Sequence, residues 1–178
     1  MNLTGLSTRE RIAIELFLDS LIPAPYLPKS GKTLDAGSGA GFPGLPLKIM
    51  MPQWDMCLLE ANGKKVSFLR HVIRLMKMAG IEAVKGRIET KGRWFLAGEY
   101  DIITARALAP LRQTVAWCAP LLRPGGVLVS FSGADSQGAL AEAEDVMKRY
   151  RLVLDKAIPY ILPGGKRERH TLLLKREG

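Results

Sequence analysis

Hydrophobic positions along the chain alternate between helix-like and strand-like spacing. The first part predicts one helix over residues 8–22. Its apolar face would comprise Ile14, Phe17, Leu18 and Leu21. Ser7 and Glu10 form a capping box at its start, and Pro23 follows its end.

Seven short apolar runs then alternate with stretches of helical periodicity. The runs predict strands at residues 33–36, 56–60, 83–85, 101–105, 126–131, 152–161 and 171–174. The helical stretches lie at residues 43–51, 64–79, 111–122 and 136–150. Strands that alternate with helices in this way are typical of a parallel sheet covered on both faces. The last two strands follow each other across Pro163-Gly164-Gly165, which predicts an antiparallel hairpin at one edge.

The length of 178 residues suits one main α/β domain. We expect residues 1–28 to form an N-terminal helical segment and residues 29–178 to form that domain. In parallel α/β sheets, ligands bind beyond the carboxyl ends of the strands. Residues that directly follow a predicted strand are therefore the first candidates for chemistry.

Positive charge is concentrated in two parts of the chain. The sequence holds 26 Lys and Arg against 17 Asp and Glu, a net charge of +9. Residues 61–94 contain nine basic and two acidic residues, and residues 164–178 contain five basic and two acidic. A localised basic patch without an apolar anchor favours nucleic acid over a membrane as the partner. A basic surface that only confers solubility is the alternative.

Other features of the composition exclude several classes of protein. A hydrophobic fraction of 47% excludes a disordered chain. The sequence has neither an apolar run of membrane-spanning length nor a signal-peptide layout, so we expect a cytoplasmic protein without membrane association. Cys57 and Cys118 cannot form a disulfide scaffold and lack metal-ligand spacing, so no bound metal is expected.

The strongest local signal is the glycine-rich segment after the first predicted strand. It reads Asp35-x-Gly37-x-Gly39-x-Gly41, and its glycines let a ligand approach the backbone closely. The spacing Gly39-x-Gly41-x-x-Gly44 also matches a dinucleotide fingerprint, which would indicate an NAD(P)-binding oxidoreductase. Asp35 favours S-adenosylmethionine instead, because a carboxylate suits a methionine ammonium group better than a pyrophosphate. A tight turn without a ligand is the third interpretation.

Two further strand ends agree with S-adenosylmethionine. Glu60 ends the second predicted strand, where its carboxylate could accept hydrogen bonds from the ribose hydroxyls; a solvated carboxylate is the alternative. Ile88 and Glu89 follow the third strand, where the Ile88 backbone and the Glu89 carboxylate could contact the adenine edge. Glu89 could equally be an acidic residue at the N-terminus of a helix.

The segment after the fourth strand, residues 105–111, is expected to face the transferred methyl group. It lacks the Asn/Asp-Pro-Pro-aromatic sequence that cradles an exocyclic amine, and it lacks the cysteine that would attack a pyrimidine ring. Arg106 offers a planar donor fork for a guanine edge or a carboxylate, with an ordinary ion pair to Asp101 or Glu99 as the alternative. A ring nitrogen such as guanine N7 loses no proton on methylation, so its chemistry needs positioning and no general base. We therefore assign no catalytic residue.

The helix predicted at residues 64–79 carries many basic side chains. Its expected buried face comprises Phe68, Val72 and Leu75. Lys65 shares that face but lies in the first turn, at the mouth of the cofactor cleft, where it could reach a substrate phosphate or extend to water. A second face, either solvated or directed at RNA, comprises Arg70, Arg74 and Lys77.

Short segments spread over nearly the whole chain point to one family. They are Asn2-Leu3-Thr4, residues 17–21, residues 35–47, residues 63–69, Arg87-x-Glu89, residues 105–109 and Glu168-Arg169-His170. Through them the chain resembles the bacterial small-subunit rRNA (guanine-N7)-methyltransferase G family, also called glucose-inhibited division protein B. Phe42-Pro43-Gly44 and Ala105-Arg106-Ala107 are more specific for this family than the glycine-rich loop.

The resemblance implies a fold, a reaction and a set of contacts. The fold would be the Rossmann-like class I S-adenosylmethionine-dependent methyltransferase, and the reaction would be methylation of N7 of a guanine in 16S rRNA or in a small-subunit assembly intermediate. The family's cofactor contacts correspond to Gly37, Phe42, Ile88, Glu89 and Arg106. The expected cofactor site is completed by Asp35, Gly39, Gly41 and Glu60. The expected substrate contacts are Lys64, Lys65, Arg169 and His170, in a monomeric protein.

The chain departs from the family at three places. One of them is Leu16, where the family often has a His before the segment 17–21. The family has a longer N-terminal helical region, so the chain is expected to be truncated relative to it. The family also has Lys-Gly after the fifth strand, where this chain has Ser132-Gly133. The missing lysine affects the expected RNA contact and keeps open a module that binds S-adenosylmethionine without methyltransferase activity.

Overall fold

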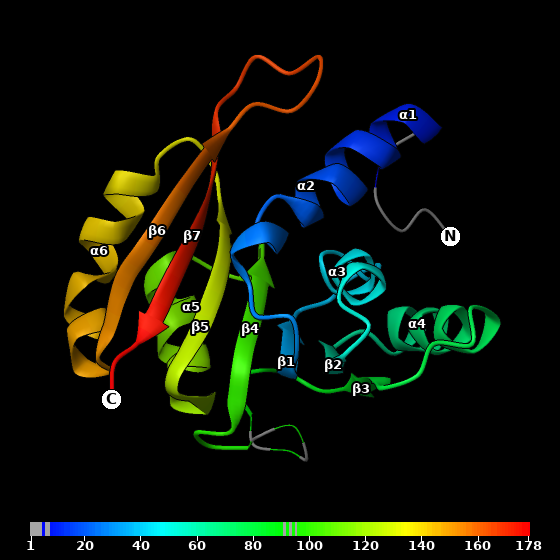
Figure 1. Cartoon of the computed structure of the whole chain (residues 1–178), viewed down its shortest axis with the longest axis horizontal. Coiled ribbons are helices and arrows are strands. Elements are labelled where there is room, and N and C mark those ends of the chain that lie inside the picture. The colour runs from blue at the N-terminus through cyan, green and yellow to red at the C-terminus, as the bar shows by residue number, and fades with distance from the viewer. Residues whose placement is uncertain (1–4, 6–7, 91, 93, 95) are drawn as a thin grey trace.

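The computed structural model describes residues 5, 8–90, 92, 94 and 96–178. Within them, one sheet consists of β1 (Gly31–Ala36), β2 (Trp54–Glu60), β3 (Ile81–Lys85), β4 (Tyr100–Arg106), β5 (Leu122–Ser132), β6 (Leu152–Tyr160) and β7 (Arg169–Arg176). Their order is β3-β2-β1-β4-β5-β7-β6, as Figure 1 shows. The first five strands are parallel, and β7 is antiparallel to both β5 and β6. The predicted fold class and edge hairpin are confirmed.

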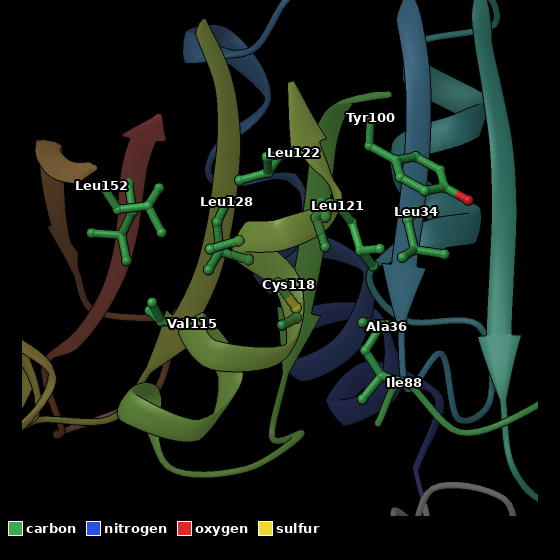
Figure 2. Packing of buried hydrophobic residues seen from close by; sticks show 14 of the residues in the cluster. Leu34, Ala36, Ile88, Tyr100, Val115, Cys118, Leu121, Leu122, Leu128 and Leu152 are labelled. Atoms are coloured by element: carbon green, nitrogen blue, oxygen red, sulfur yellow. The ribbon is translucent and has the colours of Figure 1, made fainter. Parts of the chain in front are cut away.

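Helices cover both faces of this sheet. They are α3 (Gly44–Met50), α4 (Gly63–Leu75), α5 (Leu111–Cys118) and α6 (Ser136–Arg149). Side chains of α5 and α6 pack with Leu34 and Leu128 in one core cluster, whereas those of α3 and α4 pack with Leu58 in another. Figure 2 shows Val115 and Cys118 of α5 beside Leu128. Successive side chains of a strand point to opposite faces of the sheet, so the strands contribute residues to both clusters.

The structure corrects the predicted length and buried face of α4. The side chain of Asn62 accepts from the backbone of Lys64 and Lys65, which fixes the start of the helix. The buried positions are Val66 and Leu69, whereas Leu75, expected in the core, is 71% exposed. The helix ends four residues early because Lys77 has a φ of 50° and Met78 N donates to Ile73 O, the pattern of a C-terminal cap.

The N-terminal segment forms a helix of mixed type. α1 (Arg9–Ile12) continues through a π-helical stretch, Ala13–Leu18, into α2 (Asp19–Leu21). A π-turn adds one residue and rotates every later side chain, so the predicted apolar face is wrong for Phe17 and Leu18, whereas Leu21 packs against the core. Phe17 and Leu18 are 44% and 40% exposed, while Leu16, Asp19 and Ser20 are buried. The cap is supplied by Thr8, and Ser7 lies outside the described residues.

This segment reaches the carboxyl-end edge of the sheet. In Figure 1 it lies beyond the end of β4 and on the same side of the sheet as the loop between β6 and β7. Farther along, Ala24 and Leu27 join the core cluster formed with α3 and α4. The described residues from position 8 to position 28 thus pack onto the sheet, which positions polar side chains of this segment at the carboxyl-end edge.

Candidate functional site

The glycine-rich loop between β1 and α3 follows a path that favours glycine. Gly37, Gly39 and Gly41 have φ values of 74°, 58° and 99°. A Cβ at Gly41 would lie 2.3 Å from Leu45 Cδ1, so a side chain there cannot be accommodated without a shift. The N–H groups of Gly37 and Ser38 both donate to Leu59 O at 2.9 Å. These bonds hold the loop against the end of β2.

Asp35 lies beneath the loop and not in a ligand cleft. Its side chain is fully buried, Thr104 Oγ1 donates to Oδ1 at 2.7 Å, and Gly44 N donates to Oδ2 at 3.2 Å. Burial raises the pKa of Asp35 to about 6, although these hydrogen bonds act to lower it. The expected contact with a methionine ammonium group is therefore corrected. Asp35 instead connects the loop to β4 and to the start of α3.

Glu60 supports the same loop from the end of β2. Its Oε2 accepts from Gly39 N at 2.9 Å, and its Oε1 accepts from Asn62 N at 2.7 Å. Glu60 is only 8% exposed. A carboxylate has about four acceptor positions, so each oxygen retains one for a hydroxyl group. The predicted contact with ribose hydroxyls stays a prediction, and this geometry is compatible with it.

A cleft of about 240 Å³ opens in front of the loop. Its walls are formed by Leu16, Gly37, Ser38, Gly39, Ala40, Phe42, Lys65, Arg106 and Ala107. The structure thereby brings the predicted Gly37, Gly39, Phe42, Lys65 and Arg106 to one cavity, whereas Gly41 packs against α3. Lys65 and the glycine-rich loop thus line the same cleft.

The other predicted cofactor residues lie farther along the same edge. The Ile88 side chain is 5% exposed within the core, so only its backbone is available to a ligand. Glu89 is 37% exposed and pairs with Arg87 at 3.3 Å. In the sheet order, these residues follow β3, Glu60 ends β2, the loop follows β1 and Arg106 ends β4. An elongated ligand could therefore lie across four neighbouring strand ends.

Arg106 has a partner that the sequence did not reveal. Its Nη1 lies 3.1 Å from Asp19 Oδ2, and its Nη2 donates to Glu15 O at 3.2 Å. The two alternative partners are engaged elsewhere: Asp101 pairs with Arg123, and Glu99 pairs with Lys32. Asp19 lies within a segment typical of the family, but the periodicity of the predicted helix gives it no role.

A larger cavity, of about 460 Å³, lies next to the cleft between the N-terminal segment and the β6–β7 loop. It is lined by Glu10, Arg11, Ile14, Glu15, residues 162–167 and Arg169. Arg169 Nη1 also lies 3.3 Å from Asp19 Oδ1, so this arginine borders the cavity from β7. His170 is 16% exposed, and its Nε2 lies 3.3 Å from Glu168 Oε1.

The basic face of α4 is less uniform than predicted. Arg70 Nε donates to Ala83 O at 3.0 Å, so this arginine binds the exposed edge strand β3 instead of only facing solvent. Arg74 and Lys77 border the same shallow groove, and Lys64 is exposed in the first turn of α4. Lys64 therefore lies near the cleft that Lys65 lines, without being part of its wall.

Among the described residues, no helix combines the length and the hydrophobicity of a transmembrane span. Their His, Cys, Asp and Glu side chains form no group of three or more that could hold a metal ion.

Comparisons with known proteins agree with one another. The sequence model of the rRNA small subunit methyltransferase G family matches residues 1–171. Ribosomal RNA small subunit methyltransferase G 1 of Syntrophobacter fumaroxidans is 39% identical over 180 residues, which cover 99% of this chain and 80% of the relative.

Solved structures show the same fold at low identity. A predicted O-methyltransferase from Agrobacterium tumefaciens has a TM-score of 0.74 at 15% identity and covers 90% of this chain and 81% of its own. Geranyl diphosphate C-methyltransferase from Streptomyces coelicolor, solved with S-adenosyl-L-homocysteine, has a TM-score of 0.68 at 12% identity and covers 90% and 79%.

Proposed function

The chain belongs to the rRNA small subunit methyltransferase G family, and from this premise we propose that it methylates N7 of a guanine in 16S rRNA. It is an S-adenosylmethionine-dependent methyltransferase. The observation that carries the choice of N7 is the cleft between the glycine-rich loop and Arg106. Among the residues that the structure describes, its walls offer hydrogen-bond donors and include no Asp, Glu or His that could act as a general base. Guanine N7 suits such a cleft because its lone pair attacks a methyl carbon without loss of a proton.

The residues present fit S-adenosylmethionine. Among the residues that the structure describes, the buried Nη1 of Arg106 makes no hydrogen bond of favourable geometry, although Asp19 lies close to it. Arg106 also lines the cleft, so its guanidinium group could pair with a carboxylate such as that of a methionine moiety. The glycine-rich loop and Phe42 would hold the middle of the cofactor, and Glu60, Ile88 and Glu89 would hold its nucleoside. When bound, the cofactor supplies a methyl group on a positively charged sulfur.

The RNA would approach from the side of the N-terminal segment. Lys65 lines the cleft and is placed to neutralise a phosphate beside the target base. Arg169 and Lys166 border the neighbouring cavity, which could receive the adjoining strand. Phosphate contacts of this kind position the RNA, whereas the cleft selects the base. Bacterial 16S rRNA is made in the cytoplasm, where we place the protein.

Two titrations and one transfer assay test this function. We expect purified protein to bind S-adenosylmethionine and not NADH in isothermal titration calorimetry. We expect it to transfer labelled methyl groups to small-subunit RNA that lacks the modification, and borohydride–aniline cleavage should locate the product at a guanine. Binding of NADH alone would favour an oxidoreductase. Cofactor binding without transfer to free RNA or small-subunit particles would favour an inactive binding module.

A further inference from the structure

Asp19 is a buried carboxylate that contacts three polar side chains from three different strands. It is 3% exposed. Its Oδ2 lies 3.1 Å from Arg106 Nη1 on β4, and its Oδ1 lies 3.3 Å from Arg169 Nη1 on β7. Tyr160 Oη, on β6, donates to Oδ1 at 2.8 Å. The contacts join positions up to 150 residues apart in the sequence.

Each of the two arginines borders a different cavity. Arg106 lines the cleft in front of the glycine-rich loop, and Arg169 lines the larger cavity beside the β6–β7 loop. One negative charge therefore lies between two positive charges at the boundary of the cavities. An uncompensated charge is costly in such a buried place, so the guanidinium groups are held close to Asp19. Tyr160 also fixes the carboxylate, because its hydroxyl donates to Oδ1, the same oxygen that faces Arg169.

We propose that Asp19 is a positioning residue for methyl transfer. It holds Arg106 so that the part of this side chain that lines the cleft faces the bound cofactor, and it orients Arg169 at the entrance for RNA. The inference rests on the proposed function, because it assigns Arg106 to the cofactor. The N-terminal segment is thereby part of the catalytic site, although it touches the cofactor cleft directly only through Leu16 in the described structure.

A different role would be to attach the N-terminal segment to the sheet and nothing more. Other contacts contribute to that attachment: Leu16 is buried, and Ala24 and Leu27 belong to the core. Replacement of Asp19 by the isosteric Asn should therefore leave the segment in place but release Arg106. The two roles differ in whether the effect on the cofactor passes through Arg106.

A double-mutant cycle on cofactor affinity separates these roles. Asp19→Asn should weaken S-adenosylmethionine binding about tenfold, equivalent to ~1.4 kcal/mol, and lower kcat more than it raises KM for RNA. Arg106→Ala should also weaken binding. In the Arg106→Ala background, Asp19→Asn should then change affinity by less than about twofold. Asp145→Asn is the matched control, because Asp145 pairs with Arg112 on exposed surfaces of α5 and α6.

Unchanged cofactor affinity and kcat in folded Asp19→Asn protein would overturn the positioning role. Effects of Asp19→Asn and Arg106→Ala on cofactor affinity that simply add in the double mutant would overturn it as well. If Asp19→Asn does not fold, Tyr160→Phe tests the same idea, since it removes the hydroxyl that orients Asp19 and keeps both ion pairs. An affinity and kcat equal to wild type in Tyr160→Phe would then refute the proposal. A wild-type protein that fails to bind S-adenosylmethionine refutes the proposed function instead.

Discussion

The ionisation of Asp35 should make the protein less stable as the pH rises. Asp35 is fully buried, and its pKa in the folded protein is about 6 against 3.8 for a free side chain. The cause is burial, which disfavours the charged form, and the hydrogen bonds from Thr104, Ser38 and Gly44 offset only part of it. The folded protein therefore holds the proton more tightly than the unfolded chain does.

The sign and size of the effect follow from this difference. Below pH 3.8 Asp35 is protonated in both states and contributes no pH dependence. Between the two pKa values the folded state binds more protons, so the free energy of unfolding falls as the pH rises. At ~1.4 kcal/mol per pKa unit, the difference between 3.8 and about 6 predicts a total loss of ~3 kcal/mol, complete above about pH 7.

Urea denaturation from pH 4 to pH 8 measures this contribution. We compare wild type with Asp35→Asn, which keeps an oxygen acceptor for Thr104 and cannot ionise. The difference in unfolding free energy between the two proteins should shift by ~3 kcal/mol across this range, in favour of the variant at high pH. Asp145→Asn, at an exposed carboxylate, provides the control for other titrating groups. If the difference in unfolding free energy between wild type and variant does not change with pH, ionisation of Asp35 does not destabilise the folded protein, and the prediction is wrong.

Three other predictions concern the loop, the RNA contacts and the cleft. Gly41→Ala should destabilise the protein by ~3 kcal/mol, because the new Cβ adds backbone strain and overpacks against Leu45. Gly98→Ala, where a Cβ meets open space, should cost only ~1 kcal/mol in the same urea assay. Equal losses of stability in the two variants would contradict this prediction. Lys65→Ala should lower the slope of log K for RNA binding against log salt concentration by ~0.7–0.9 and should also weaken cofactor binding. Arg74→Ala should leave cofactor affinity unchanged. Identical behaviour of the two variants in the RNA titration and in the cofactor titration would refute this difference. Arg106→Ala should reduce turnover at least about 100-fold in the methyl-transfer assay, with little change in salt slope; full turnover would remove Arg106 from the site.

The arrangement of the strands and the glycine-rich loop could be predicted because local patterns determine them. Apolar runs separated by helical periods indicate a parallel sheet, and loops after its strands lie at one edge. On this basis Gly37 and Arg106 are expected at one edge, the family resemblance adds Phe42, and all three line one cleft. The division between residues 1–28 and 29–178 stays a prediction.

The burial of charge could not be predicted in the same way. The periodicity argument assumes that apolar side chains face inward, so it placed Phe17 and Leu18 in the core and left Asp19 unexamined. The structure has the reverse, because the N-terminal segment meets a polar edge of the sheet where Arg106 and Arg169 need a counter-charge. Both partners are distant in sequence, and no local pattern reports them.

Asp35 shows a second limit, although here a usable signal existed. A carboxylate at a strand end suggested a ligand contact, yet side chains alternate along a strand. Leu34 and Ala36 face the cluster around α5, so Asp35 must face the opposite side, where α3 begins above it. Strand alternation, applied to that one residue, would have placed its carboxylate under the loop.

These corrections lead to a consistent division of roles at the site. The carboxylates of Asp19, Asp35 and Glu60 are each at least nine-tenths buried and are bonded to other parts of the protein. Buried charges with partners keep the surrounding groups in fixed positions, because separating the partners would leave a buried charge without a counter-charge or hydrogen bond. In the described structure, the groups left to meet a ligand include backbone atoms of the glycine-rich loop, Phe42, the cations Lys65 and Arg106, the remaining acceptor positions of Glu60 and the exposed carboxylate of Glu89. Under the proposed function, these groups would hold a methionine carboxylate and a negatively charged RNA, and methylation at N7 would require none of them to remove a proton.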